Sequence, residues 1–474
     1  MHRLRENILP LTIAFALLME LIDATILSTA LPVMARDLDV AVLSLKMAMT
    51  TYLIAFAAFV PVSGWIADRF GARRVFLSAM SVFIGASALC AMQSDLGGLV
   101  AARALQGLGA AMMTPVGRLI VLRNTDRKEL VRAMVYLTAP ALLGPALGPF
   151  IGALVTQSLG WRWIFLINIP LGSIALILAA RHLPRDLPAD PVPFDITGFI
   201  LSAIGLAAIM AGLSSLGEHI MPMPAALGLS VTGFGLMVLY TLRARGRSDA
   251  LLDPRLFRHR TFSIGIWGGT AFRLSNGAIA LLLPLLFQLG LGMSILASGA
   301  LAGLTAIGAL SIRGFSGRVV DRFGFRPVLI FGTFIRAASL LGFGTISSPT
   351  DWYLVPLLLT GGVAQALTFT AINAITFADL PPEEMSKGAS LSAVAQQMSL
   401  TLGIALAGGA LELSAYSLDL TISNSLIPLH AFALAFALVA VTGPIAILVF
   451  SKLRPEDGAA LRHKDVKPRL STQH

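Results

Sequence analysis

Long apolar runs separated by short polar segments dominate the chain. A helix needs about 20 mostly apolar residues to cross a bilayer, and fourteen stretches of this sequence meet that requirement. The pattern predicts an all-α polytopic membrane protein. The predicted spans cover residues 10–34, 47–67, 75–93, 97–121, 133–157, 161–181, 195–216, 221–242, 262–289, 296–317, 327–346, 352–378, 388–412 and 427–451.

A polar segment that follows the second span recurs later in the chain. The stretch from Gly64 to Arg73 returns from Gly317 to Arg326, and each copy follows the second span of a six-span group. Chance similarity between two basic loops is the alternative interpretation. The repeat predicts two halves in one orientation with a cavity at their interface. The expected parts are a six-helix half at 10–181, two additional transmembrane helices at 195–242, a second six-helix half at 262–451 and a cytoplasmic tail at 452–474.

Composition and charge agree with lipid as the main surroundings. The chain is 56% hydrophobic and 13% charged, against about a quarter charged in soluble domains. Its net charge is +10, and the basic residues concentrate in alternate connecting segments, with only Arg36, Lys46 and Arg162 in the others. Basic loops face the cytoplasm, so both termini are expected there. Glu20 and Asp23 interrupt the first run, which reads as a span and not as a cleaved signal peptide.

Several function classes find no support in the sequence. Cys90 is the single cysteine, the seven histidines are scattered, and no Gly-rich loop ends in Lys-Ser or Lys-Thr. We therefore expect no metal site, no cofactor, no nucleotide-driven pump and no enzyme site, and the chain shows no nucleic-acid motif. Energy for uphill transport would come from an ion gradient or from another protein.

Five stretches resemble the major facilitator superfamily and, within it, the fourteen-helix drug:proton antiporter family of bacterial multidrug exporters. The resemblance covers nearly the whole chain and implies alternating access in a bacterial inner membrane, proton-coupled export, and in some relatives a periplasmic adaptor as partner. The stretches are Asp23–Pro32, Gly64–Arg74, Arg103–Gly109, Gly144–Gly152 and Trp163–Pro170.

Two acids lie within the first span. Asp23 sits about 20 Å along its helix at 1.5 Å per residue, so its carboxyl group should face the cavity and exchange a proton. A structural hydrogen bond is the alternative. Glu20 precedes it by one turn, where the related exporters usually carry a neutral amide. Glu20 and Asp23 could share a proton, or Glu20 could form an ion pair with Arg273, which occupies its position in the second half.

Arg103 lies near the outer end of the fourth span, and the resemblance implies a role in the proton pathway. A buried guanidinium needs acceptors, which an acid on the first helix would supply; snorkelling to the interface is the alternative. Gln106 follows one turn later on the same face. Arg336 also lies within a span, and a structural partner is the simplest expectation for it.

The fifth span repeats glycine every fourth residue, a stripe that allows tight helix packing, and two prolines within it each remove a backbone hydrogen bond. We expect this helix to seal the interface between the halves, and the resemblance implies export. Ordinary packing is the alternative. The residues are Gly144, Pro145, Gly148, Pro149 and Gly152.

The repeated loop has a second expected role besides topology. By resemblance, Asp68 latches the halves while the cavity opens outward, and the glycines permit close approach. The expected latch residues are Gly64, Asp68, Arg69, Gly71, Arg73, Asp321 and Arg322.

The substrate wall is expected from polar side chains on the second half with adaptable apolar partners. The candidates are Gln106, Arg273, Asn276, Gln365, Asn373, Gln396 and Gln397, with Met112, Met113 and Phe369. The whole pattern predicts a proton-coupled exporter of small amphipathic compounds. An exporter of one metabolite or metal chelate fits equally well, and a proton-symport importer fits less well because of the Gly-Pro stretch.

Overall fold

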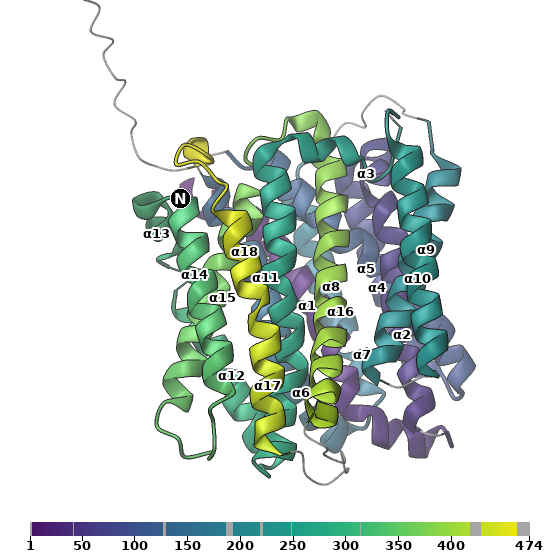
Figure 1. Ribbon diagram of the computed structural model, residues 1–474. Coiled ribbons are helices and arrows are strands. Elements are labelled where there is room, and N and C mark those ends of the chain that lie inside the picture. Colours follow the sequence, from purple (N-terminus) through teal and green to yellow (C-terminus); the bar gives the residue numbers. More distant parts are fainter. Residues whose placement is uncertain are drawn as a thin grey trace, which may run out of the picture.

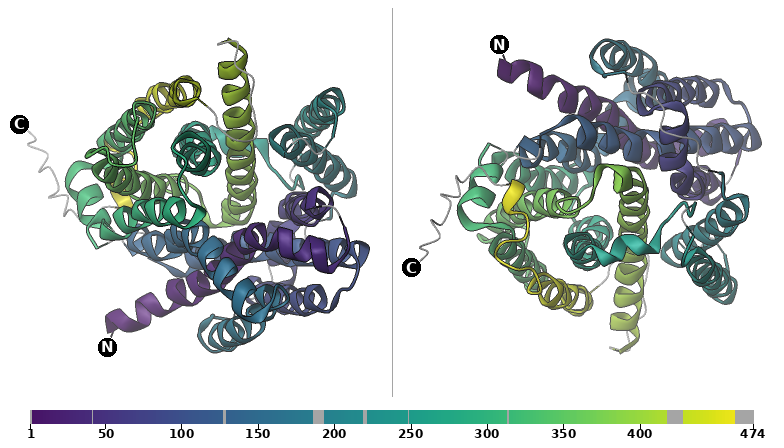
Figure 2. Two further views of the ribbon diagram at one scale, coloured as in Figure 1. Left: turned by 90° about the horizontal axis from the view of Figure 1, so that it is seen from below. Right: turned by 90° about the horizontal axis from the view of Figure 1, so that it is seen from above.

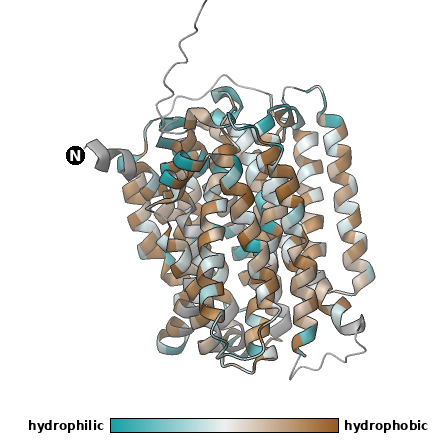
Figure 3. Cartoon of the chain, turned by 60° about the vertical axis from the view of Figure 1, so that its left-hand side comes forward, coloured by the Kyte–Doolittle hydropathy of each residue, from teal (hydrophilic) through white to brown (hydrophobic). Residues whose placement is uncertain are grey.

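The computed structural model describes residues 2–40, 42–126, 129–185, 193–218, 221–247, 249–312, 314–417 and 428–461. These residues form helices and connecting turns, without a strand in the described ranges. Most helices run side by side through the bundle (Figure 1). Apolar residues cover the length of the helices and hydrophilic residues gather toward their ends (Figure 3), as expected for a protein surrounded by lipid.

The chain divides into three successive groups of helices. The first contains α1 (His2–Asp37), α2 (Val42–Phe59), α3 (Ser63–Phe70), α4 (Ala72–Met92), α5 (Leu96–Asn124), α6 (Leu130–Leu159), α7 (Trp163–Leu166) and α8 (Asn168–His182). The second contains α9 (Ile196–Glu218) and α10 (Met223–Ala244). The third contains α11 (Arg260–Leu285), α12 (Ile295–Ser311), α13 (Ser316–Phe323), α14 (Phe325–Phe343), α15 (Leu354–Ile375), α16 (Met385–Ser417), α17 (Leu429–Ala440) and α18 (Thr442–Phe450).

Twelve helices in the described residues are long and apolar enough to cross a membrane, and the bent pair α12 and α13 would make a thirteenth. This number is consistent with the fourteen predicted spans. The predicted span 133–157 falls within α6, and 296–317 falls on α12 and α13.

The first and third groups form two bodies that lie side by side when the bundle is viewed along its axis (Figure 2). The second group lies beside them. Its helices α9 and α10 pack on each other, and α9 also contacts α2 of the first half and α16 of the second.

The sequence repeat is also a structural repeat. In the first half, α3 and α4 are joined at Gly71, whose φ is 87°, and in the second half α13 and α14 are joined at Gly324, whose φ is 83°. A positive φ is strained for residues with a Cβ atom, which explains a glycine at both turns. We call this end of the bundle the Gly71 end, and the end that holds the turn between α6 and α7 the Gly160 end.

The buried apolar core is shared between the halves at one end only. Toward the Gly71 end, one cluster joins first-half residues such as Val62 and Phe76 to second-half residues such as Phe377 and Phe450. Toward the Gly160 end each half has its own cluster, around Phe165 in the first half and around Phe432 in the second. In the described residues the halves are therefore packed together most extensively at the Gly71 end.

Candidate functional site

Asp23 lies at the centre of a buried hydrogen-bond network inside the first half. Its carboxylate is an acceptor from Arg103 at 2.7 Å, from Gln106 at 3.0 Å and from Asn168 at 2.5 Å. Four helices meet there, because Ser87 of α4 accepts a hydrogen bond from Gln106 at 2.7 Å. The structure thus brings together the three predicted residues Asp23, Arg103 and Gln106.

Arg103 is 1% exposed, so its guanidinium does not reach the membrane–water interface. The snorkelling alternative is therefore wrong. Its guanidinium also donates to Gln106 at 2.6 Å and lies 4.4 Å from the centre of the Tyr52 ring. Removing one partner of such a buried pair leaves an uncompensated charge, which costs roughly 3–5 kcal/mol. The pair is therefore sensitive to anything that neutralises Asp23.

A cavity of about 190 Å³ lies between the halves. The first half contributes Glu20, Tyr52 and Arg118 to its wall, and the second half contributes Phe369 and Gln396. Asp23 does not line this cavity, contrary to the expectation from its depth. Its carboxyl group faces α5 and α8 instead, because their amide and guanidinium groups satisfy it there.

Glu20 is the acid of the cavity wall, and the predicted ion pair between Glu20 and Arg273 is wrong for this conformation. The Glu20 carboxylate accepts a hydrogen bond from Thr114, at 3.0 and 3.1 Å from its two oxygens. Arg273 donates to Asn373 at 3.4 Å and lies 5.3 Å from the centre of the Phe369 ring. Phe369 lines the cavity, whereas Arg273 is not among the residues of its wall.

Arg118 is a functional candidate that sequence reasoning missed. It lies on α5, lines the cavity and donates across the interface to Ser392 and to Gln396 of α16, both at 3.0 Å. A signal was available, because Arg118 is a basic residue inside the predicted span 97–121. Asn168 was within the quoted Trp163–Pro170 stretch without a role, whereas Ser87 and Thr114 carry no signal among many small polar residues.

The remaining substrate candidates lie in different places. Gln397 and Phe369 line the cavity, whereas Gln365, Met112 and Met113 are not in its wall. Asn276 accepts a hydrogen bond from Arg336 at 3.0 Å, which gives Arg336 the structural partner expected for it.

The glycine stripe packs α6 against α1. A Cβ atom on Gly144 would lie 2.6 Å from the Leu21 side chain, and one on Gly148 would lie 1.9 Å from the Thr25 hydroxyl. Gly152 is buried, and Pro145 and Pro149 lie within the continuous helix. The stripe therefore tightens a contact within the first half, next to the helix that carries Asp23. The contact of α6 with the other half is made with α12, α13 and α15.

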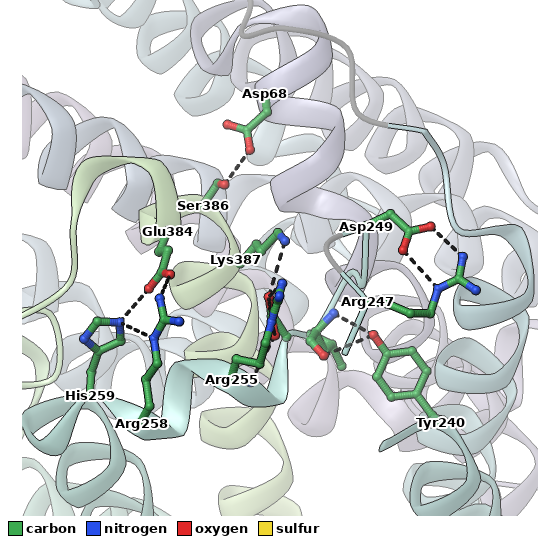
Figure 4. A network of polar contacts seen from close by, with 12 residues as sticks. Asp68, Tyr240, Arg247, Asp249, Arg255, Arg258, His259, Glu384, Ser386 and Lys387 are labelled. Atoms are coloured by element: carbon green, nitrogen blue, oxygen red, sulfur yellow. Dashed lines mark hydrogen bonds and ion pairs between the residues drawn. The ribbon is translucent and has the colours of Figure 1, made fainter. Parts of the chain in front are cut away.

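The expected latch lies against α16 at the Gly71 end. Asp68 accepts hydrogen bonds from Arg123 at 2.7 Å and from Ser386 of the other half (Figure 4). The Gly64 amide donates to Ser390 at 3.0 Å, and a Cβ atom on Gly64 would lie 2.8 Å from the Ser386 carbonyl oxygen. Asp68 and Gly64 thus hold α3 closely on α16.

The other predicted latch residues have different surroundings, and the second copy of the loop packs on α6 of the first half. Arg69 is exposed, and Arg73 donates to the Ala180 carbonyl within the first half. In the second copy Asp321 is half-buried, the Arg322 guanidinium lies 5.5 Å from the Phe323 ring, and Gly317 has open space around it.

A second group of charges ties the start of α11 to the start of α16. Arg258 and His259 both contact Glu384, and Lys387 contacts Asp253 at 3.5 Å (Figure 4). These contacts join the segment before α11 to the start of α16. They therefore fix the part of α16 that contains Ser386, the residue that contacts Asp68.

Comparisons with known proteins agree with this architecture. The profile of the Major Facilitator Superfamily matches residues 13–266 and again 265–472. The "Putative multidrug resistance protein MdtD" of Cronobacter sakazakii is 39% identical over 398 residues, which is 84% of each chain. The protein of the same name from Escherichia fergusonii is 38% identical over the same share.

Two solved structures share the fold. The human organic anion transporter MFSD10 has a TM-score of 0.62 at 16% identity, covering 94% of this chain and 99% of its own. The proton:xylose symporter XylE has a TM-score of 0.64 at 14% identity, covering 95% and 96%. These likenesses concern the fold alone, whereas the profile match and the close relatives establish descent. The chain belongs to the major facilitator superfamily and is a multi-pass membrane transporter.

Proposed function

We propose that this transporter exports small amphipathic compounds from the bacterial cytoplasm across the inner membrane in exchange for protons. The observation that carries the proposal is the buried Asp23–Arg103 pair, one helical turn from the acid that lines the cavity. Ionisable groups inside a membrane protein are costly and mark proton and substrate pathways. The proposal assigns transport and no enzymatic activity to the chain.

Protonation of Asp23 would remove the negative charge that holds Arg103. The guanidinium would then turn toward other acceptors, and its contact with the Tyr52 ring connects this change to the cavity wall. Glu20, on the same helix, is the second proton acceptor in the proposal. Cargo bound beside Glu20 and a proton bound at Asp23 then favour different arrangements of α1, α2 and α5, which is the requirement for exchange.

The direction of opening follows from the packing of the two ends. Both halves share one apolar core at the Gly71 end, and their cores are separate at the Gly160 end. Basic loops such as the one with Arg73 and Arg74 lie at the Gly71 end, which favours the cytoplasm for that end and for both termini. In the proposed cycle this conformation is closed to the cytoplasm and precedes opening to the outside.

Export is favoured over uptake by two observations. The relatives bear the name of a multidrug resistance protein, and the Gly144–Gly152 stripe fixes α6 on the helix that carries both acids. A periplasmic adaptor would dock at the Gly160 end in this scheme.

Transport in proteoliposomes tests the proposal. Three labelled probes share one ring system and carry permanent or no charge, so a pH gradient alone does not concentrate them: naphthalene-1-sulfonate, naphthalene-1-sulfonamide and trimethyl(1-naphthylmethyl)ammonium. We expect the wild type to accumulate at least one probe against its gradient when a pH gradient is imposed. Asp23→Asn should lose this accumulation and keep exchange of labelled for unlabelled probe.

Asp37→Asn is the matched control, because it makes the same change in the first helix at the Gly160 end and should behave as the wild type. Undiminished accumulation by Asp23→Asn would remove Asp23 from coupling. Failure of the wild type to accumulate all three probes would contradict the proposed function.

A further inference from the structure

Two buried arginines, one in the wall of the central cavity and one next to that wall, have no carboxylate partner among the described residues. Arg118 bonds only neutral acceptors, the Ser392 hydroxyl and the Gln396 amide oxygen. Arg273 bonds the neutral amide oxygen of Asn373. Glu20 is held by Thr114, and neither arginine is within ion-pair distance of a carboxylate in the described part of the chain. The Arg118 guanidinium therefore lines the cavity without a carboxylate partner, and the Arg273 guanidinium lies next to Phe369 of the same wall.

Arg273 is the less satisfied of the two cations. It is 1% exposed, and its Nε and one terminal nitrogen have no hydrogen-bond partner among the described residues. Leaving buried donors unpaired costs roughly 1–3 kcal/mol for each group, and more for a charged one. Binding of an anion to the unpaired donors of Arg273 would remove this cost.

Phe369 connects Arg273 to the cavity. This residue lines the cavity, and the Arg273 guanidinium lies 5.3 Å from the centre of its ring. A rotation of the Phe369 side chain would let the unpaired donors of Arg273 face the cavity. Leu17, Leu53 and Phe56 form an apolar part of the same wall, so the cavity offers an apolar surface next to a pair of cations.

We propose that the cargo of this cavity is a small amphipathic anion, with its carboxylate, sulfonate or similar acidic group held between Arg118 and Arg273 and its apolar part against Leu53 and Phe56. Paired, planar guanidinium groups suit such oxyanions because they donate in parallel. The inference rests on the proposed function, since it names the cargo class of the same cavity.

The second half contains a matched control for Arg273. Arg336 is 2% exposed, also leaves its Nε and one terminal nitrogen unpaired, and also bonds a neutral amide, that of Asn276. Neither Arg336 nor Asn276 lines the cavity. Loss of folding or of general packing should therefore affect Arg273→Gln and Arg336→Gln alike, whereas loss of an anion site should affect Arg273→Gln alone.

Calorimetric binding to the purified full-length protein in detergent tests the inference with the three naphthalene probes. We expect the wild type to bind the sulfonate at least about tenfold more tightly than the sulfonamide or the ammonium probe, a difference of about 1.4 kcal/mol. Arg273→Gln and Arg118→Gln should each lose that preference and retain sulfonamide binding. Arg336→Gln should keep the preference.

Each other result has a defined meaning. Equal or tighter binding of the ammonium or the sulfonamide probe overturns the inference, as does binding of no probe or a preference that survives in Arg273→Gln. Because Arg118→Gln tests the same site from the other half, an unfolded Arg273→Gln still leaves a decisive variant. Anion-selective binding without gradient-driven transport would overturn the proposed coupling alone, and gradient-driven transport of the ammonium probe would overturn the anion site alone.

Discussion

Asp23 in the first half and Asn276 in the second occupy equivalent positions, since each precedes its copy of the repeated loop by the same number of residues. Each accepts a hydrogen bond from a buried arginine, Asp23 from Arg103 at 2.7 Å and Asn276 from Arg336 at 3.0 Å. The arginines come from different helices, α5 and α14. A carboxyl group can release a proton and an amide cannot, so at this pair of equivalent positions only the first half can carry the proposed proton exchange.

The two copies of the repeated loop also differ in how closely their first glycine packs on the other half. Gly64 is pressed against Ser386 and Ser390 of the other half, whereas Gly317 has open space where a Cβ atom would lie. Each copy of the loop packs on the other half, α3 on α16 and α13 on α6, but only Gly64 of the first copy is closely packed there. The predictions below test this asymmetry.

The largest expected effect concerns stability. Arg103→Leu leaves the Asp23 carboxylate buried without its cation and should lower the free energy of unfolding by about 3–5 kcal/mol. Arg336→Leu leaves only a neutral amide without a donor and should cost about 1–3 kcal/mol. Unfolding by sodium dodecyl sulfate, followed by tryptophan fluorescence, compares the two.

The double variant Asp23→Asn with Arg103→Leu identifies the cause of that loss. It should recover part of the stability, because no carboxylate then remains unpaired. Equal losses of stability in Arg103→Leu and Arg336→Leu, or no recovery in the double variant, would contradict this account. Either result would mean that the charge of Asp23 is not what makes its contact with Arg103 the stronger one.

A smaller effect is expected on the conformational equilibrium. Gly64→Val places side-chain atoms where Ser386 and Ser390 lie, so it should open the Gly71 end. Spin labels at the exposed positions Arg74 and Glu383 report this in liposomes as a new population of longer distances. Gly317→Val should give the wild-type distribution; a shift in both variants would mean that both loops latch this state.

Asp68→Asn should act on the same equilibrium more weakly. Its partner Arg123 and Asp68 itself have side chains that are 27% and 29% exposed, and pairs so exposed contribute at most about 1 kcal/mol. The same pair of spin labels should show a partial shift toward longer distances. A shift larger than that of Gly64→Val would assign the latch to charge and not to close packing.

The smallest effect concerns Asp37 at the Gly160 end. Hydrogen bonds from Trp161 and then from Arg162 hold the pKa of Asp37 below its usual value. A lowered folded-state pKa gives stability that is present above the ordinary carboxyl pKa and is lost as the pH falls through the lowered one. The second half has Gly290 at the equivalent position.

The wild type should therefore be slightly more stable than Asp37→Asn at neutral pH. The difference should disappear in acid, as measured by thermal unfolding across a pH series. A stability difference that stays constant across the pH series would mean that side-chain packing, and not the charge of Asp37, causes it.

The sequence predicted the fold and the arginine partner of Asp23 well, because apolar length and buried charge are strong local signals. It placed Asp23, Arg103 and Gln106 in one group, and the structure shows them bonded together. The sequence does not show which way a side chain points around its helix. It therefore predicted that Asp23 faces the cavity, whereas Glu20 lines the cavity and Asp23 does not. Repeat position alone suggested Glu20 with Arg273, but Thr114 and Phe369, which carry no sequence signal, occupy the contacts of each.

The most direct test of the account is the proton that Asp23 is proposed to exchange. Addition of a probe that binds the wild type to purified protein in weakly buffered solution, followed with a pH-sensitive dye, measures net proton movement on binding. The account predicts a proton change for the wild type and for Asp37→Asn and a much smaller one for Asp23→Asn at equal probe occupancy. A proton change in Asp23→Asn equal to that of the wild type would contradict it.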